Sequence, residues 1–271
     1  MNERPSVAAA IRASLETAEP YAKVMAVRAL ARDWRGGRLA HRFDCPMPDR
    51  PARPAEPVLL PPGRMPKRGR GNSERGRIAL WHALAHIEFV AIDLALDMAG
   101  RYGDRMPPEF ISDFLGVAAD EAMHFVLLDR RLRQLGSRYG ALPAHDGLWE
   151  SAHATRHDVA ARLAIVPMVL EARGLDVTPL TIVRAREAGD ETGARILERI
   201  LDDEIRHVRI GSNHFAALCE ARSESPVNLW KSLVQSHFRG AIKPPFNDSA
   251  RRSAGLSLEM YGVVAMPAGG S

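Results

Sequence analysis

The sequence predicts an all-α protein built on a four-helix bundle. Helical periodicity continues from Ser73 to about residue 238, and no alternating strand pattern of useful length interrupts it. Four helical segments are long, and one longer connection separates the second from the third, as in bundles with a crossover. An N-terminal helical extension and a proline-rich strap precede this part of the chain.

The first 72 residues are expected to form a separate region. Short helices are predicted over residues 6–18 and 21–34, divided at Glu19-Pro20. Eight prolines follow in the 21 residues from 46 to 66, which favours an extended strap. We expect this strap to pack on the helices, because its prolines lower the entropy cost of fixing it.

The bundle is expected to occupy residues 73–240, followed by a tail over residues 241–271. Ser73 is a suitable cap for the first long helix, and Pro107-Pro108 is a suitable start for the second. The long helices are predicted at about 74–100, 108–135, 149–173 and 190–221, with shorter helices near 179–188 and 228–238.

The composition is that of an ordinary globular protein, with 271 residues, 46% of them hydrophobic and 26% charged. Cys45 and Cys219 are far apart and form no CxxC pair, which excludes thiolate zinc sites and thioredoxin-like chemistry. Charges stand at the N-terminus where a signal peptide needs an apolar run, and they also interrupt the most apolar stretch, 78–100. We therefore expect a cytoplasmic protein without a membrane segment.

Positive charge is concentrated in the N-terminal part. Residues 1–77 contain 16 Lys and Arg against 8 Asp and Glu, whereas the remainder contains 21 against 25. The stretch 64–77 alone has six basic residues, but it lacks the aromatic residues of a base-stacking platform. A solvated loop is therefore favoured there over a phosphate-binding strap.

Two Glu-x-x-His pairs carry the chemical signal, Glu121/His124 and Glu204/His207. Residues three apart on a helix share a face, so each pair can direct a carboxylate and an imidazole to one point. Each pair alone is a weak signal, and the spacing strengthens it: Glu88 precedes Glu121 by 33 residues, and Glu171 precedes Glu204 by 33. The two sets are offset by 83 residues, which indicates two copies of one helix pair.

Four carboxylates and two imidazoles brought together by such a repeat predict a site for two metal ions. Buried carboxylates without cations are costly, and two divalent ions would neutralise four of them. Mixed oxygen and imidazole ligation suits Fe and Mn better than Zn. Small residues near the predicted ligands, Ala85, Ala91, Gly174 and Gly211, were expected to leave room for O2 or a substrate.

The segment Asp203-Glu-Ile-Arg-His207 resembles the DExRH motif of soluble di-iron oxygenases and ribonucleotide reductases. The segments HALAHIEFVAIDLAL, HDGLWE, LEARGLDVTP and KPPFND are similar to a bacterial ferritin-like family, DUF455, over roughly residues 73–250. The resemblance implies a ferritin-like four-helix bundle with Glu88, Glu121, His124, Glu171, Glu204 and His207 as ligands. It also implies that Asp120, Asp203 and Arg206 surround them, with the aspartates holding the ligand histidines. The first copy departs from the motif, with Met123 where Arg206 stands in the second.

These features favour an O2-activating di-iron oxygenase or hydroxylase, with two Fe or a Mn/Fe pair as cofactors and O2 as co-substrate. Such an enzyme would need an external electron donor and a small-molecule or modified-nucleoside substrate. Alternatives are a di-iron hydroxylase that modifies tRNA, with tRNA bound by the basic N-terminal part, and an iron-handling or peroxide-scavenging protein. A structural bundle is a further alternative. We expect a monomer or dimer, because about 75 residues precede the bundle, unlike in the compact chains of storage cages.

Other histidines receive structural interpretations. His82 and His86 share a face that points away from Glu88, so packing or polar roles are favoured over ligation. His157 and His214 are interpreted as core histidines. His145 and Asp146, in the crossover, are interpreted as capping groups, with a pocket role as the alternative.

Overall fold

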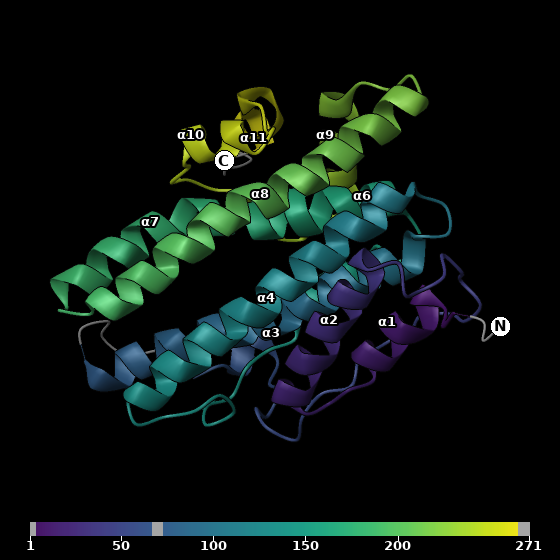
Figure 1. Cartoon of the computed structure of the whole chain (residues 1–271). Coiled ribbons are helices and arrows are strands. Elements are labelled where there is room, and N and C mark those ends of the chain that lie inside the picture. The colour runs from purple at the N-terminus through teal and green to yellow at the C-terminus, as the bar shows by residue number, and fades with distance from the viewer. Residues whose placement is uncertain (1–3, 67–72, 265–271) are drawn as a thin grey trace. The chain divides into compact units, whose positions relative to one another are not determined.

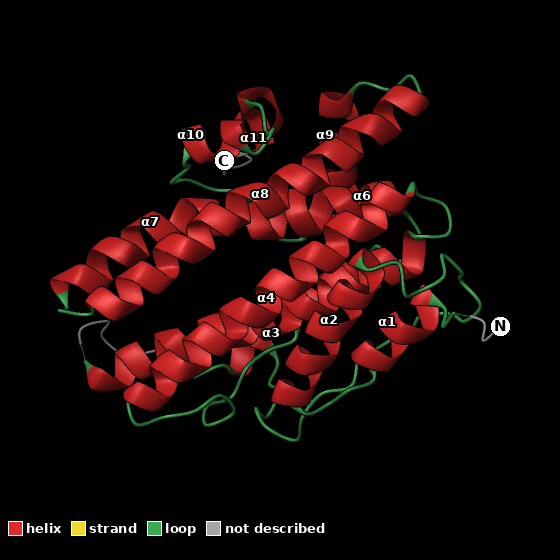
Figure 2. Ribbon diagram, in the orientation of Figure 1, coloured by secondary structure: helices red, strands yellow, loops and turns green. Residues whose placement is uncertain are grey.

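The computed structural model describes residues 4–66 and 73–264. Within these ranges the regular structure is helical, with two isolated β-bridges and no extended strand, which confirms the all-α prediction (Figure 2). The chain divides into two compact units, Met1–Trp149 and Glu150–Ser271. The domain boundaries predicted from the sequence are not tested by this division and stay a prediction.

The first unit is organised around one long helical hairpin. The side chain of Ser73 caps the first helix by accepting the backbone N–H of Gly76 (3.0 Å), and Pro108 opens the second. The two helices run side by side (Figure 1), and Phe89 and Phe125 pack between them with ring centroids 5.3 Å apart. Its elements are α1 (Val7–Leu15), α2 (Pro20–Arg35), η1 (Pro62–Arg64), α3 (Glu74–Tyr102) and α4 (Pro108–Gln134), and α5 (Gly147–Ala154) crosses the boundary between units.

The strap, residues 46–66, is irregular apart from η1 and packs on this hairpin. The Arg53 guanidinium pairs with the buried carboxylate of Asp93 on α3. Met47 lies against Gly100, where a Cβ would stand only 2.4 Å from the Met47 sulfur. The prediction that the strap packs on helices is therefore confirmed. Of the basic stretch 64–77, residues 67–72 lie outside the described part of the chain.

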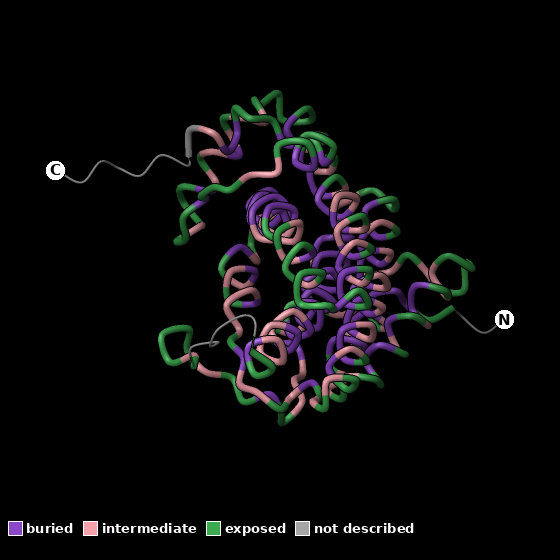
Figure 3. The backbone as a smooth tube through the Cα atoms, turned by 90° about the vertical axis from the view of Figure 1, so that its left-hand side faces the viewer, coloured by how far each residue is buried: buried purple, intermediate pink, exposed green. Residues whose placement is uncertain are grey.

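α3 is long and apolar enough to cross a membrane by length and composition. Its most apolar window is 67% buried inside the protein, as in the core helix of a soluble protein. Along the helices, buried residues alternate with exposed ones (Figure 3), as amphipathic helices require. Burial within the protein thus accounts for the apolar run in α3.

The second unit also contains a long helical hairpin, in which α7 and α8 lie side by side (Figure 1). Asp190 caps α8 by accepting the backbone N–H of Gly193 (2.6 Å). The elements of this unit are α6 (Val159–Ile165), η2 (Val166–Glu171), α7 (Ala172–Glu187), α8 (Glu191–Ala221), α9 (Pro226–His237), α10 (Asp248–Ser253) and α11 (Leu258–Val264). The prediction had no counterpart for α10 and α11, which are short.

The single helix predicted over 149–173 is wrong. The chain leaves helical geometry after Ala154, and Asp158 starts α6 by accepting the N–H of Ala160 (2.9 Å). η2 is a π-helical stretch with Pro167 near its start, and a proline is a recognised cause of such a break because it removes a donor and crowds the preceding turn.

The predicted break before residue 179 is also wrong, because α7 continues through Pro179. Pro179 has no N–H, so the carbonyl of Leu175 loses its helical partner. The Asn247 side-chain amide donates to that carbonyl instead (3.2 Å). A residue 68 positions further along the chain thus allows proline inside this helix.

Candidate metal centre

Three predicted ligands come together inside the first unit. α3 supplies Glu88, and α4 supplies Glu121 and His124 from one face. Each residue offers a ligand atom, and these atoms all lie within 4.8 Å of one another. His124 Nδ1 is 3.2 Å from Glu121 Oε2 and 3.5 Å from Glu88 Oε2. The three side chains are buried, with Glu121 and His124 fully inaccessible.

The electrostatics of this cluster call for a positive charge. Burial, reinforced by repulsion from Glu121, raises the pKa of Glu88 well above its ordinary value, although His124 acts in the opposite direction. Two carboxylates this close cannot both stay ionised cheaply in a buried site. A cation can replace the proton that the raised pKa indicates. The cluster could therefore hold a metal ion, and its donor set of carboxylates and imidazole suits Fe or Mn.

The second unit contains the corresponding pair on α8. Glu204 and His207 are buried, and His207 Nδ1 lies 3.7 Å from Glu204 Oε1. Glu171 is half-buried at the last residue of η2. π-helical turns often occur at functional sites, because they change the direction of a side chain within a helix. The assignment of Glu171 as a ligand stays a prediction.

The residues predicted to surround the ligands are less buried. Asp203 pairs with Arg206 (3.3 Å) and approaches Arg199 (3.8 Å) along α8. Asp120 is half-buried on α4, next to Glu121. The predicted role of Asp120 and Asp203 in holding the ligand histidines stays a prediction.

His82 and His86 act as polar packing residues, as predicted. His82 Nε2 accepts the backbone N–H of Gly140 (3.0 Å), and His86 joins the Tyr139 hydroxyl (2.9 Å) to the carbonyl of His145 (3.1 Å). Burial lowers the pKa of each ring to about 4. Both imidazoles are therefore neutral at pH 7.

The remaining histidines differ from the interpretation as core residues. His157 is exposed in the break between α5 and α6, and His214 is half-buried on α8. In the crossover, His145 Nδ1 accepts the N–H of Gly147, the first residue of α5 (3.3 Å), which confirms its capping role. Asp146 instead pairs with Arg53 of the strap (3.2 Å).

The expectation of free space beside Gly211 is wrong. A Cβ at Gly211 would lie 2.4 Å from the Pro167 ring, so glycine is needed there for η2 to approach α8. By contrast, nothing lies within 4 Å of the Cβ position at Gly174.

Sequence reasoning missed the role of two buried aspartates, each five residues after a predicted glutamate ligand. Asp93 binds Lys23 of α2 (2.5 Å) and Arg53 of the strap. Asp176 receives two hydrogen bonds from Arg251 of α10 (2.8 and 2.7 Å). The 83-residue offset that relates Asp93 to Asp176 was the available signal, but their partners lie outside the repeat.

Fold and site together define an all-α protein with a buried carboxylate–imidazole cluster that could hold a metal ion. The chain matches the family described as "Protein of unknown function (DUF455)" over residues 16–262, and it belongs to that family. A protein of Haemophilus influenzae described as "Uncharacterized protein" is 41% identical over 210 residues, which cover 75% of this chain and 73% of the relative. No solved structure matches the chain.

Proposed function

We propose that the protein is a non-haem di-iron or manganese/iron protein that uses O2 to oxygenate or hydroxylate a small substrate. The observation that carries the proposal is the buried cluster of Glu88, Glu121 and His124, whose carboxylates require a cation. The same residue types recur as Glu171, Glu204 and His207 with the same spacing. We propose that the two sets form one ferritin-like centre, as in other carboxylate-bridged di-metal bundles.

The chain's own contribution would be to hold and shield this centre. Glu88 and Glu121 supply negative charge from two neighbouring helices, and His124 adds a neutral donor beside them. Burial of all three keeps bulk water away, which strengthens every electrostatic interaction at the site. When bound, the metal pair would supply redox chemistry toward O2, with electrons from an external donor.

The tRNA alternative has less support than the small-molecule proposal. Several cations of the basic N-terminal part are engaged inside the protein, since Lys23 and Arg53 both pair with Asp93. Others lie in local surface pairs, such as Arg38 with Asp33. Binding to tRNA driven by these charges would weaken steeply with salt. A salt-insensitive or absent affinity for tRNA would be consistent with the small-molecule proposal.

Elemental analysis of purified protein tests the centre directly. The wild-type chain should contain about two Fe or Mn atoms, as expected for this ligand set. Glu121→Gln keeps the shape of the side chain and removes its charge, so it should lose most of the metal. Glu150→Gln, at an exposed position, is the matched control and should retain it. Folded wild-type protein without Fe or Mn, or with zinc alone, would contradict the proposal.

Two further measurements separate the parts of the proposal. Glu204→Gln should also lose metal if both sets of ligands share one centre, whereas unchanged metal content would show that the first set binds independently. Ferrous-loaded wild-type protein should consume O2 faster than the same iron free in buffer. If the loaded protein reacts no faster, the oxygenase assignment fails while the metal centre stands.

A further inference from the structure

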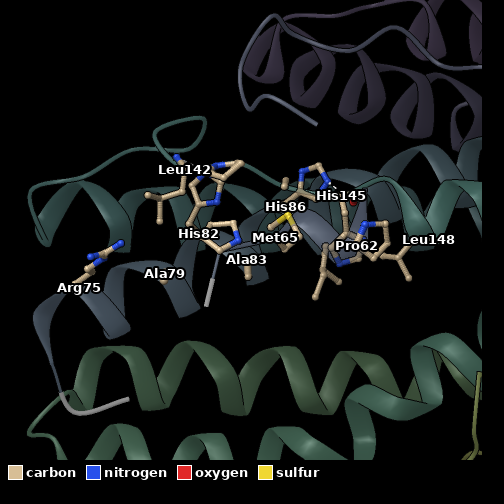
Figure 4. A pocket seen from close by; sticks show the side chains of 14 residues that line it. Pro62, Met65, Arg75, Ala79, His82, Ala83, His86, Leu142, His145 and Leu148 are labelled. Atoms are coloured by element: carbon tan, nitrogen blue, oxygen red, sulfur yellow. Dashed lines mark hydrogen bonds between the residues drawn. The ribbon is translucent and has the colours of Figure 1, made fainter. Parts of the chain in front are cut away.

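A cavity of about 310 Å³ lies along α3 in the first unit, and the metal cluster does not use it. Its walls come from α3, from the end of the strap and from the segment before α5. Figure 4 shows Arg75 at one end, His82 near the middle and Leu148 at the other end. The cavity therefore joins a cationic end to an apolar end.

Successive residues of a helix are turned by about 100°, so Ala79 lies about 180° around α3 from Glu88. Arg75, His82 and His86 lie on the same side as Ala79, away from Glu88. The cavity is thus a separate feature of the unit. An inference about it does not depend on the metal.

His82 directs an unused hydrogen-bond donor toward this cavity. Its Nε2 accepts backbone N–H groups from Gly140 (3.0 Å) and Leu142 (3.4 Å), so Nε2 has no proton. The neutral ring must then carry its proton on Nδ1. Nδ1 has no hydrogen-bond partner in the described part of the chain, although the residue is only 2% exposed. A buried donor of this kind calls for an acceptor on a ligand.

Arg75 supplies charge at the same end. Its side chain is exposed, makes no ion pair with any described residue, and extends toward His82 in Figure 4. It stands in the first turn of α3, where the helix dipole also favours an anion. A cation, a dipole and an N–H donor at one end of the cavity together select an acidic group.

The rest of the cavity is suited to a hydrocarbon chain. Met65 and Pro62 of the strap face Ile87, Leu142 and Leu148 across it. Ile87 is 43% exposed, an unusual position for a large apolar side chain on a core helix. A volume of 310 Å³ corresponds to roughly ten water-sized groups at about 30 Å³ each. The ligand should therefore have about ten non-hydrogen atoms.

We propose that this cavity binds a small carboxylic acid with an apolar chain of about eight carbons. The carboxylate would lie between Arg75 and the Nδ1–H of His82, and the chain would run along α3 toward Leu148. Because the carboxylate is the only polar part, such a ligand matches the cavity at both ends.

Isothermal titration calorimetry on the full chain tests this proposal, with octanoate as the probe and 1-octanol as its uncharged counterpart. Octanoate should bind at least ten-fold more tightly than 1-octanol. Arg75→Gln should weaken octanoate at least ten-fold and leave 1-octanol unchanged. Arg195→Gln, at an exposed position on α8, is the matched control and should change neither.

Ala83→Leu fills the cavity and should abolish binding of both probes, with circular dichroism to check that the variant is folded. The Arg75→Gln comparison decides the proposal even if Ala83→Leu does not fold, because Arg75 is exposed. Three results would overturn the proposal: no binding of octanoate, equal binding of the two probes, or octanoate binding that survives a folded Ala83→Leu variant.

Discussion

Removing the charge of Asp176 should strongly destabilise the second unit. Its carboxylate is fully buried and accepts two bonds from Arg251, and a third from the backbone N–H of Asn247 (3.0 Å). The Arg251 guanidinium is 4% exposed and also lies over the ring of Tyr261. Asp176→Asn keeps the shape of the side chain but leaves this guanidinium buried without its counter-ion.

Breaking a buried pair from one side costs about 3–5 kcal/mol. For a chain of this size that corresponds to a fall of roughly 6–20 °C in melting temperature. The side-chain exposures of 0% and 4% mean that solvent screening reduces this cost little. Arg251→Met should be destabilising for the same reason, because it leaves the carboxylate without its cation.

Urea unfolding of Asp176→Asn, Arg251→Met and the double variant measures the coupling. The double variant contains no unpaired charge, so its loss should be smaller than the sum of the two single losses by about 2 kcal/mol. Asp202→Asn, exposed on α8, is the matched control and should stay within about 0.5 kcal/mol of wild type. Additive losses, or a loss below about 1 kcal/mol for Asp176→Asn, would refute the reasoning.

The remaining predictions concern acid, a close helix contact and metal removal. Burial holds the pKa of His86 near 4, so the stability that depends on its neutral form is complete above pH 6.5 and falls by roughly 3 kcal/mol toward pH 4; urea unfolding at several pH values should show a flatter profile for His86→Gln, whereas exposed His157→Gln should leave the profile unchanged. Gly211→Ala should cost about 1–3 kcal/mol because its Cβ meets the Pro167 ring, whereas Gly174→Ala, with open space, should be neutral or stabilising by up to about 1 kcal/mol; equal melting temperatures for the two would contradict this. Chelation of bound metal should lower the melting temperature of the wild type, because a ligand held by the native state stabilises it, and an unchanged transition after verified metal removal would contradict a structural contribution of the centre.

The sequence predicted the helices with clear ends and long periodic patterns. Ser73, Pro107-Pro108 and Asp190 all stand at helix starts, and the corresponding helices begin within about two residues of the predicted positions. The segment after residue 149 was misread because its ends depend on tertiary contacts. Pro179 resembled a helix break, and only the distant Asn247 amide explains why the helix continues.

For the candidate site, spacing was sufficient to select Glu88, Glu121 and His124, because residues on two long helices repeat with a fixed period. Burial could not be obtained in the same way. Asp93 and Asp176 had the same sequence appearance as surface aspartates, since their cationic partners lie 70 and 75 residues away in the chain. Local pattern therefore identified the candidate ligands and missed the ion pairs beside them.

These ion pairs bear on where the chain can be shortened. Each hairpin contains a negative socket, and the chain fills the two sockets from opposite directions: Lys23 and Arg53 from upstream for Asp93, and Arg251 from downstream for Asp176. A fragment that keeps only the hairpins would retain both negative charges and none of these cations. Trimming either end would thus act in the interior, five residues from a predicted ligand, rather than at the surface where the cut is made.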